Sequence, residues 1–190
     1  MGLGAISDAF ENTSFTIFHG RWNRCLEGVL TSPRSYRSMV GAYVLAAALR
    51  GLVVGVLIAL IGAFFTSVGV VRPLYLVAFG IVITLLFAAL GVAGGLWADD
   101  FDDLTMLNQF ILRPLVFFGG VFYSLNELPA TVQQVSLLNP MIYMVNGVRF
   151  GFLGVSEVDP NASLAVLSGL TLAVVAVDVS LFRRGYGLAE

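Results

Sequence analysis

Residues 110–154 have the sequence FILRPLVFFGGVFYSLNELPATVQQVSLLNPMIYMVNGVRFGFLG. The stretch begins as an apolar helix, is interrupted at residues 124–129, and continues as two short apolar pieces hinged at Asn139 and Pro140. A membrane-crossing helix needs roughly 20 apolar residues, and each piece offers only about ten to fourteen. We therefore expect both pieces to lie at, or dip into, one face of a membrane. Broken backbone at that depth is tolerated only where protein or a water-filled cavity satisfies its polar groups, so the stretch predicts a cavity or a partner interface.

The composition assigns the chain to a class. Of its 190 residues, 58% are hydrophobic and 12% are charged, whereas soluble domains contain about 25% charged residues. The sequence therefore predicts an all-α integral membrane protein. The single cysteine, Cys25, excludes an internal disulfide, and the single histidine, His19, excludes a histidine cluster that could bind a metal.

Four apolar runs are long enough to cross a bilayer, and we assign them to one transmembrane domain, residues 1–190. The spans are expected at residues 46–68, 73–97, 104–123 and 163–182. Residues 38–45 are expected to form an interfacial approach to the first span, with Arg50 near one end of that span. Arg113 falls near the middle of the third span, where an arginine costs roughly 2.5 to 3.5 kcal/mol. The third helix therefore needs neighbours.

The segment before the first span, residues 1–37, has no positively charged start and no long apolar run, so it does not resemble a signal peptide. Residues 21–30 have the spacing of a short amphipathic helix, which Pro33 and the residues before it end. Its apolar face carries Trp22, Leu26, Val29 and Leu30, and its charged residues are Arg21, Arg24 and Glu27.

The arginines predict the orientation, because positively charged loops stay in the cytoplasm. With four spans, one side holds six arginines and the other holds only Arg72 and Arg149. The six are Arg21, Arg24, Arg34, Arg37, Arg183 and Arg184. We therefore expect the N-terminal segment and the C-terminus in the cytoplasm and the re-entrant region, residues 124–160, outside.

Few side chains suggest chemistry. The run DDFDD at residues 99–103 could bind a cation, or it could be a solvated loop whose last carboxylates cap the third helix. His19 and Cys25 could form a base and a nucleophile, but no third group that would orient them is apparent. Asp178 is the only carboxylate inside a span. We therefore expect no catalytic residue, no metal site and no cofactor site in this chain, and no nucleic acid as a partner.

Arg113 has two interpretations. It could line a polar path or bind an anionic group of a substrate, or it could be an interhelical partner of Asp178 or of a carbonyl group. Glycine pairs four residues apart, at 51 and 55, 91 and 95, and 147 and 151, predict close helix packing. The chain has no lysine and so cannot bind ATP through a Walker motif of its own.

Several motifs together resemble the type 2 ATP-binding-cassette (ABC) exporter permeases. They are the Leu-Thr-Ser-Pro ending of the amphipathic segment, Leu49-Arg50-Gly51, GGVFYS at residues 119–124, Leu128-Pro129, Leu138-Asn139-Pro140 and YMVNGVRFG at residues 143–151. The resemblance implies a six-span plan, a dimer with a second permease protomer, identical or different, and two separate ATPase subunits that bind ATP and magnesium. It also implies that residues 21–30 are the coupling helix that touches the ATPase. Residues 128–153 would be the outer re-entrant helices, and the lipid bilayer of a prokaryotic plasma (inner) membrane would surround the protein.

The chain departs from that family plan at two points. It has four spans, and its start matches a point within or just after the family's second span, so we expect either a misplaced start or a shortened product. Arg113 stands where the resemblance implies an uncharged residue, and if it is specific to a subgroup of the family we expect it to bear on the substrate. The candidate residues for a translocation path or for packing are Arg113, Asn139, Pro140, Asn146 and Arg149.

Two functions follow from these observations. The first is a permease subunit that exports an unidentified substrate when a bound ATPase hydrolyses ATP. The alternative is a truncated, non-transporting membrane scaffold or regulatory subunit that binds the ATPase.

Overall fold

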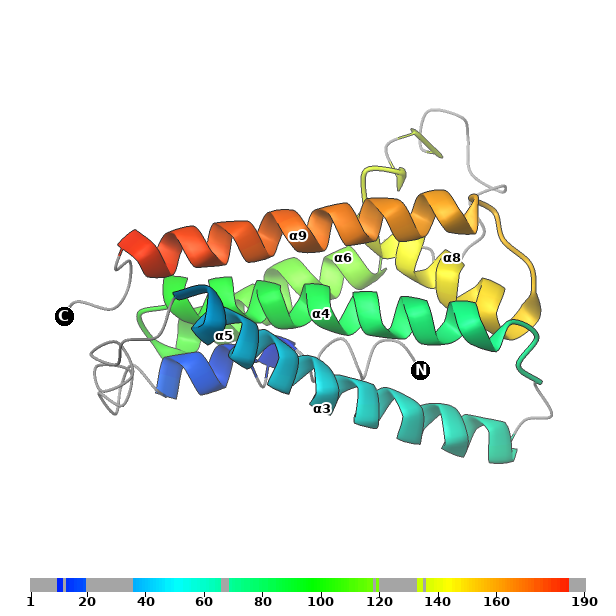
Figure 1. Cartoon of the computed structure of the whole chain (residues 1–190), viewed down its shortest axis with the longest axis horizontal. Helices are drawn as coiled ribbons and strands as arrows, with labels where there is room; N and C mark the ends of the chain where they lie inside the picture. Colours follow the sequence, from blue (N-terminus) through cyan, green and yellow to red (C-terminus); the bar gives the residue numbers. More distant parts are fainter. Residues whose placement is uncertain are drawn as a thin grey trace.

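The computed structural model describes residues 10–11, 13–19, 36–65, 69–117, 119, 133–134 and 136–184. The regular elements among these residues are helices, as expected from the long apolar runs (Figure 1). Three of them are long and apolar enough to cross a membrane: α3 (Tyr36–Phe65), α4 (Pro73–Trp97) and α9 (Pro160–Arg184). The described part of the chain is therefore an all-α membrane protein.

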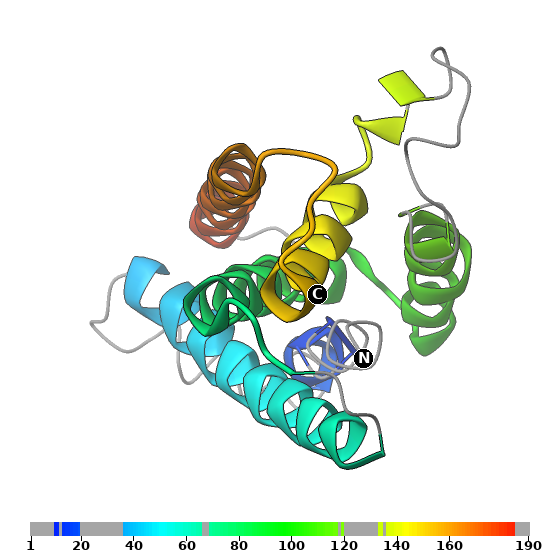
Figure 2. The same cartoon turned by 90° about the vertical axis from the view of Figure 1, so that its right-hand side faces the viewer.

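Helix α4 is the centre of the bundle. Viewed along the helices, α9 lies above α4, α3 crosses below it, and α8 (Pro140–Leu153) lies beside it (Figure 2). Half of the most apolar stretch of α4 is buried inside the protein, against 22% for α3 and 17% for α9. The remaining apolar surface of α3 and α9 has the character of a surface that faces lipid, because water-soluble proteins rarely expose large continuous apolar patches.

Helix α3 begins earlier than the sequence suggested. It starts at Tyr36, and its candidate spanning part is Val40–Gly62, not residues 46–68. No proline stands between Tyr36 and residue 46, so nothing in this stretch prevents the helix from beginning at Tyr36. As a result Arg50 lies near the middle of the candidate span and not at its end.

The third predicted span is a helix with a change of geometry inside it. It consists of α5 (Phe101–Met106), the π-helix η1 (Leu107–Leu112) and α6 (Arg113–Phe117). The amide of Arg113 donates to the carbonyl oxygen of Asn108, five residues earlier. The wider turn lies directly before Pro114, which lacks an N–H donor and whose ring would collide with the carbonyl four residues before it in an ordinary α-helix. Apart from residue 119, the rest of the expected span lies outside the described residues.

The acidic run before this helix forms its N-terminal cap. The amides of Asp99 and Asp100 donate to a carboxylate oxygen of Asp103, at 3.1 and 3.3 Å. These bonds satisfy backbone donors at the helix start, where negative charge is also favoured by the helix dipole. The interpretation of this run as a solvated cap therefore fits the structure.

Residues 13–19 form helical turns that pack against the second half of α4. Ile17 is fully buried. A Cβ atom at Gly91 would lie 2.7 Å from Cβ of Thr13, and one at Gly95 would lie 2.7 Å from the carbonyl oxygen of Ser14. The glycine pair at 91 and 95 thus allows close helix packing, as its spacing predicted. Sequence reasoning did not identify residues 13–19 as a packed helix.

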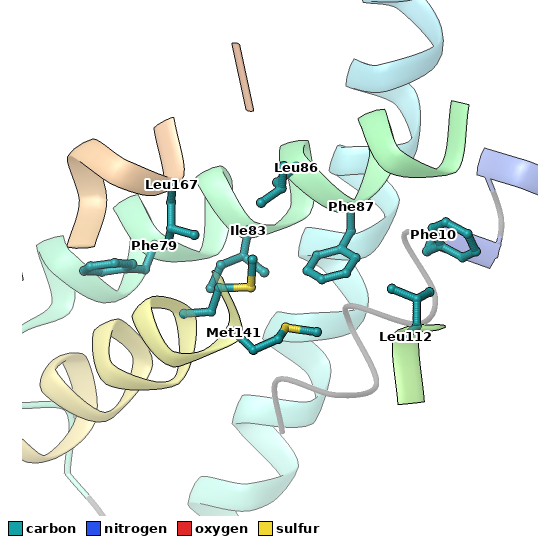
Figure 3. Packing of buried hydrophobic residues seen from close by; sticks show 9 residues of the cluster. Phe10, Phe79, Ile83, Leu86, Phe87, Leu112, Met141 and Leu167 are labelled. Carbon is teal, nitrogen blue, oxygen red and sulfur yellow. The ribbon is translucent and has the colours of Figure 1, made fainter. Parts of the chain in front are cut away.

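Helix α8 runs antiparallel to the first half of α4. Gly151 faces Leu76 and Gly147 faces Phe79. At the other end of α8, Met141 joins the buried cluster that contains Ile83 of α4 (Figure 3). With 14 residues, α8 is about 21 Å long, too short to cross a bilayer. It begins near the middle of α4 and ends beside Arg72, at the end of the bundle where α4 begins.

The core is built around this meeting point. Its buried side chains come from α4, α8, α9, η1 and the N-terminal segment (Figure 3). They are Phe10, Phe79, Ile83, Leu86, Phe87, Leu112, Met141, Met144 and Leu167.

We predict that Gly147→Ala lowers the stability of the protein by about 1 to 3 kcal/mol, because the added methyl group would overlap the ring of Phe79 in a packed interface. The control is Gly169→Ala, since a Cβ atom at Gly169 of α9 meets nothing within 4 Å. Thermal unfolding of the purified protein in detergent measures both. If the two variants unfold at the same temperature, α8 is not packed on α4 as described.

Candidate functional site

The Asn139 side chain connects two helices at the level where α8 begins. Its Nδ2 donates to the carbonyl oxygen of Leu115 at 3.0 Å, and its Oδ1 accepts from the amide of Met141 at 3.0 Å. The first bond satisfies a carbonyl near the end of α6, and the second caps the start of α8. Pro140 follows at the first position of α8, where a missing N–H has no cost. The sequence singled out both residues as a hinge.

The Asn146 side chain fastens α8 to the connection that leads into α9. It is buried, and its Nδ2 donates to the carbonyl oxygen of Val158 at 2.7 Å. Its Oδ1 accepts from the amides of Glu157, at 2.8 Å, and Val158, at 3.3 Å. Asn146 thus takes the place of backbone partners for a connection that has no regular structure of its own, which explains its burial in an apolar helix.

Three further contacts lie at the end of the bundle where α8 ends and where α4 and α9 begin. Arg149 pairs with Glu157 at 2.8 Å, and both side chains are largely shielded from solvent. The hydroxyl of Tyr75 on α4 donates to Asn161 on α9 at 3.0 Å. The amide of Arg72 donates to the carbonyl oxygen of Gly151 at 2.9 Å. The turn before α4 and the connection before α9 are therefore both tied to α8, and the start of α9 is tied to α4.

Another polar contact joins the N-terminal segment to the π-helix. Asn108 donates a side-chain hydrogen bond to the carboxylate of Glu11. Both side chains are partly buried. Sequence reasoning missed this pair, although a polar residue within the apolar run of residues 104–117 and a carboxylate beside Phe10 were visible signals.

Arg113 lies on the exposed side of the helix that η1 belongs to. No hydrogen bond or ion pair joins its guanidinium to another residue that the structure describes. The predicted pairing with Asp178 is absent from the described residues, because neither carboxylate oxygen of Asp178 has a hydrogen-bond partner there. Asp178 is fully buried on the face of α9 that carries Phe182, which packs against α3 and α4. Arg113 and Asp178 are therefore separate features.

The structure brings together some of the predicted site residues and not others. Asn139 and Pro140 meet Leu115, two residues after Arg113, while Asn146 and Arg149 lie further along α8, toward the end that the ion pair closes. The proposed coupling residues lie outside the described part of the chain. They are Arg21, Trp22, Arg24, Leu26, Glu27 and Leu30.

Three helices long enough to span a bilayer, with a short helix that enters only halfway between them, define a multi-span integral membrane protein. The chain belongs to the ABC-2 type transporter family, which it matches over residues 9–153. Members of this family are membrane subunits of ABC transporters, and membership implies pairing with an ABC ATPase subunit.

Relatives of known sequence agree with this assignment. The chain is 34% identical to the inner membrane transport permease YadH of Escherichia coli (strain K12) over 186 residues, which are 98% of this chain and 73% of YadH. It is 28% identical over 124 residues to the daunorubicin resistance ABC transporter permease protein DrrB1 of Streptomyces coeruleorubidus, covering 65% and 42% of the two chains. Nodulation protein J of Rhizobium leguminosarum bv. viciae is 24% identical over 100 residues, or 53% and 39%. No solved structure matches the chain.

We predict that Asn139→Ala frees the start of α8, because it removes both the acceptor for the Met141 amide and the donor to Leu115. Loss of such a cap costs about 0.5 to 2 kcal/mol. Hydrogen exchange of a peptide that covers residues 140–145, followed by mass spectrometry, should show faster exchange than in the unaltered protein. Asn139→Ser keeps a neutral acceptor that can cap the helix, and its exchange should be slower than that of Asn139→Ala. Equal exchange in all three proteins would show that Asn139 does not cap α8.

Proposed function

We propose that the chain is the permease subunit of an ABC-type exporter, which moves its substrate outward while a separate ATPase subunit, holding ATP and magnesium, hydrolyses ATP. Family membership and the similarity to YadH and DrrB1 support this proposal. The single observation in the structure that carries it is the attachment of the N-terminal segment. Residues 13–19, which directly precede the proposed coupling helix, are packed against the centre of the bundle.

The contacts form a continuous route from the coupling segment to α8. Residues 13–19 sit on Gly91 and Gly95 of α4, and Glu11 is bonded to Asn108 in the π-helix. The same continuous helix reaches Leu115, whose carbonyl group is bonded to Asn139 at the start of α8. A push from the ATPase on residues 21–30 would therefore move the N-terminal segment, η1 and α8 together. The π-helix is a natural place for such a change, because its wider turn can shift without breaking the helix.

The proposed orientation follows from the arginines and the positive-inside rule. Arg183 and Arg184 end α9 at the end of the bundle opposite to α8 (Figure 1). We assign that end, with the segment around residues 21–30, to the cytoplasm of a prokaryotic cell and the α8 end to the outside. The substrate path would lie between two permease protomers, whose spans tilt apart when the ATPase closes.

The proposal is tested by double substitution of Trp22 and Leu26 with alanine. These two residues lie on the apolar face of the predicted coupling helix, and buried aromatic and aliphatic anchors carry most of the energy of an interface. We expect the tagged variant, purified from its native host in mild detergent, to retain at most about a tenth of the ATPase that accompanies the unaltered chain. Mass spectrometry identifies the partner by its Walker A motif.

The matched control is Leu45→Ala together with Leu49→Ala, because both side chains are exposed on α3 in the candidate span and should face lipid. This control should keep both membrane insertion and the ATPase. If the Trp22 and Leu26 variant keeps its full share of ATPase, residues 21–30 do not form the coupling contact. If the unaltered chain brings down no ATPase at all, the proposed function itself fails.

A further inference from the structure

Arg113 lies about halfway along the length of the bundle, on the exposed side of its helix. The residue before it, Leu112, packs in the buried cluster with Phe87 and Phe10 (Figure 3). Phe87 is close to the midpoint of α4, which runs from Pro73 to Trp97. Arg113 is therefore near mid-depth, where an arginine exposed to lipid is costly and where such residues mark substrate pathways or partners.

The helix from α5 to α6 has two different sides. Leu104, Asn108 and Leu112 turn toward the bundle and the N-terminal segment. The opposite side is exposed, and we name it the Arg113 face. It consists of Thr105, Met106, Gln109, Phe110 and Arg113.

The Arg113 face combines two kinds of surface. Thr105, Gln109 and Arg113 follow one another at four-residue spacing and make a polar line along the helix. Met106 and Phe110 lie beside this line and are 56% and 72% exposed. The guanidinium has no ion partner among the described residues, and the carboxylates on its own helix, Asp102 and Asp103, lie at the helix start and not near Arg113. A polar, positively charged line beside apolar side chains matches a ligand that is anionic at one end and apolar at the other.

We infer that the Arg113 face binds an anionic amphiphile, with a phosphate or carboxylate head and a hydrocarbon tail, and that such a molecule is the substrate class; the transport part of this inference rests on the proposed function. The planar guanidinium matches either head group with two parallel hydrogen bonds. Its positive charge also balances the negative charge of the head group inside the membrane, where no water solvates it. The tail packs beside Met106 and Phe110.

The test uses the full chain with its co-purified ATPase in nanodiscs of phosphatidylcholine. Two probes carry the same pyrene-labelled dodecyl tail, one with a phosphate head and one with a trimethylammonium head, and empty nanodiscs give the background. We expect the phosphate probe to bind about ten times more tightly than the ammonium probe. Arg113→Gln should remove about tenfold of this affinity, and Arg113→Lys should restore only part of it, because the charge is kept but the two parallel hydrogen bonds of the guanidinium are lost. Arg183→Gln changes an exposed arginine at the far end of α9 and should leave binding unchanged.

A competition arm identifies the source of the anionic head. Displacement of the phosphate probe by phosphatidylglycerol supports the inference and assigns the ligand to the bilayer lipids. Displacement by free dodecyl phosphate or laurate, but not by phosphatidylglycerol, supports it and assigns the ligand to single-chain amphiphiles.

Four results overturn the inference. The first is equal binding of the two head groups, the second is unchanged binding by Arg113→Gln, and the third is no binding above empty nanodiscs. The fourth is that Arg113→Gln converts a dimer into a monomer and leaves the probe affinity unchanged. That result would make the Arg113 face a contact between two copies of the chain. The proposed function fails separately. If no ATPase co-purifies but the head-group preference persists, the site stands and its role in transport falls; if the ATPase is present without any preference, only the inference falls.

Discussion

The rest of the structure depends on the two hydrogen bonds of the Asn139 side chain, because they satisfy backbone polar groups where the chain leaves one helix and starts the next. A membrane interior offers no water to an unpaired backbone group, so a chain that breaks at depth must satisfy its own polar atoms. The Asn139 side chain does so at both sides of the break, by donating to Leu115 and accepting from Met141. Helix α8 can therefore begin near the middle of the bundle, and Gly147 and Gly151 then let it lie directly against α4.

Helix α4 receives two elements from opposite ends. Its first half is covered by α8, through glycines on α8, and its second half is covered by residues 13–19, through glycines on α4 itself. In a bilayer, close packing of this kind replaces the hydrophobic driving force that water supplies to soluble proteins. The π-helix connects the two elements, because Asn108 is bonded to Glu11 and Leu115 is bonded to Asn139. A movement that begins at the N-terminal segment thus has a physical route to α8.

Much of this architecture was readable from the sequence. Long apolar runs indicated the helices, Pro73 and the acidic residues after Trp97 gave the bounds of α4, and the hinge at Asn139 and Pro140 indicated a short helix after it. The start of α3 was missed because the sequence has no breaker near residue 46, and hydropathy alone does not say where a helix begins. The contact of Glu11 with Asn108 depends on tertiary packing between residues 97 positions apart, and no local pattern encodes it. For Arg113 the sequence left two interpretations open, an interhelical partner and a polar path. The burial of Leu112 and the exposure of Arg113 depend on how this helix packs, which no local pattern encodes.

The most direct test of the central claim, that α8 enters the bilayer and begins at mid-depth, is thiol cross-linking in native membranes. In a Cys25→Ser background, Ile83→Cys is combined either with Met141→Cys at the start of α8 or with Leu153→Cys at its end. Met141 shares the buried cluster with Ile83, and Leu153 lies at the opposite end of the 14-residue helix. The account predicts that a short bifunctional methanethiosulfonate joins residues 83 and 141 and does not join residues 83 and 153. Failure of the 83–141 pair, in a protein that inserts normally, would place α8 on the membrane surface and contradict the account.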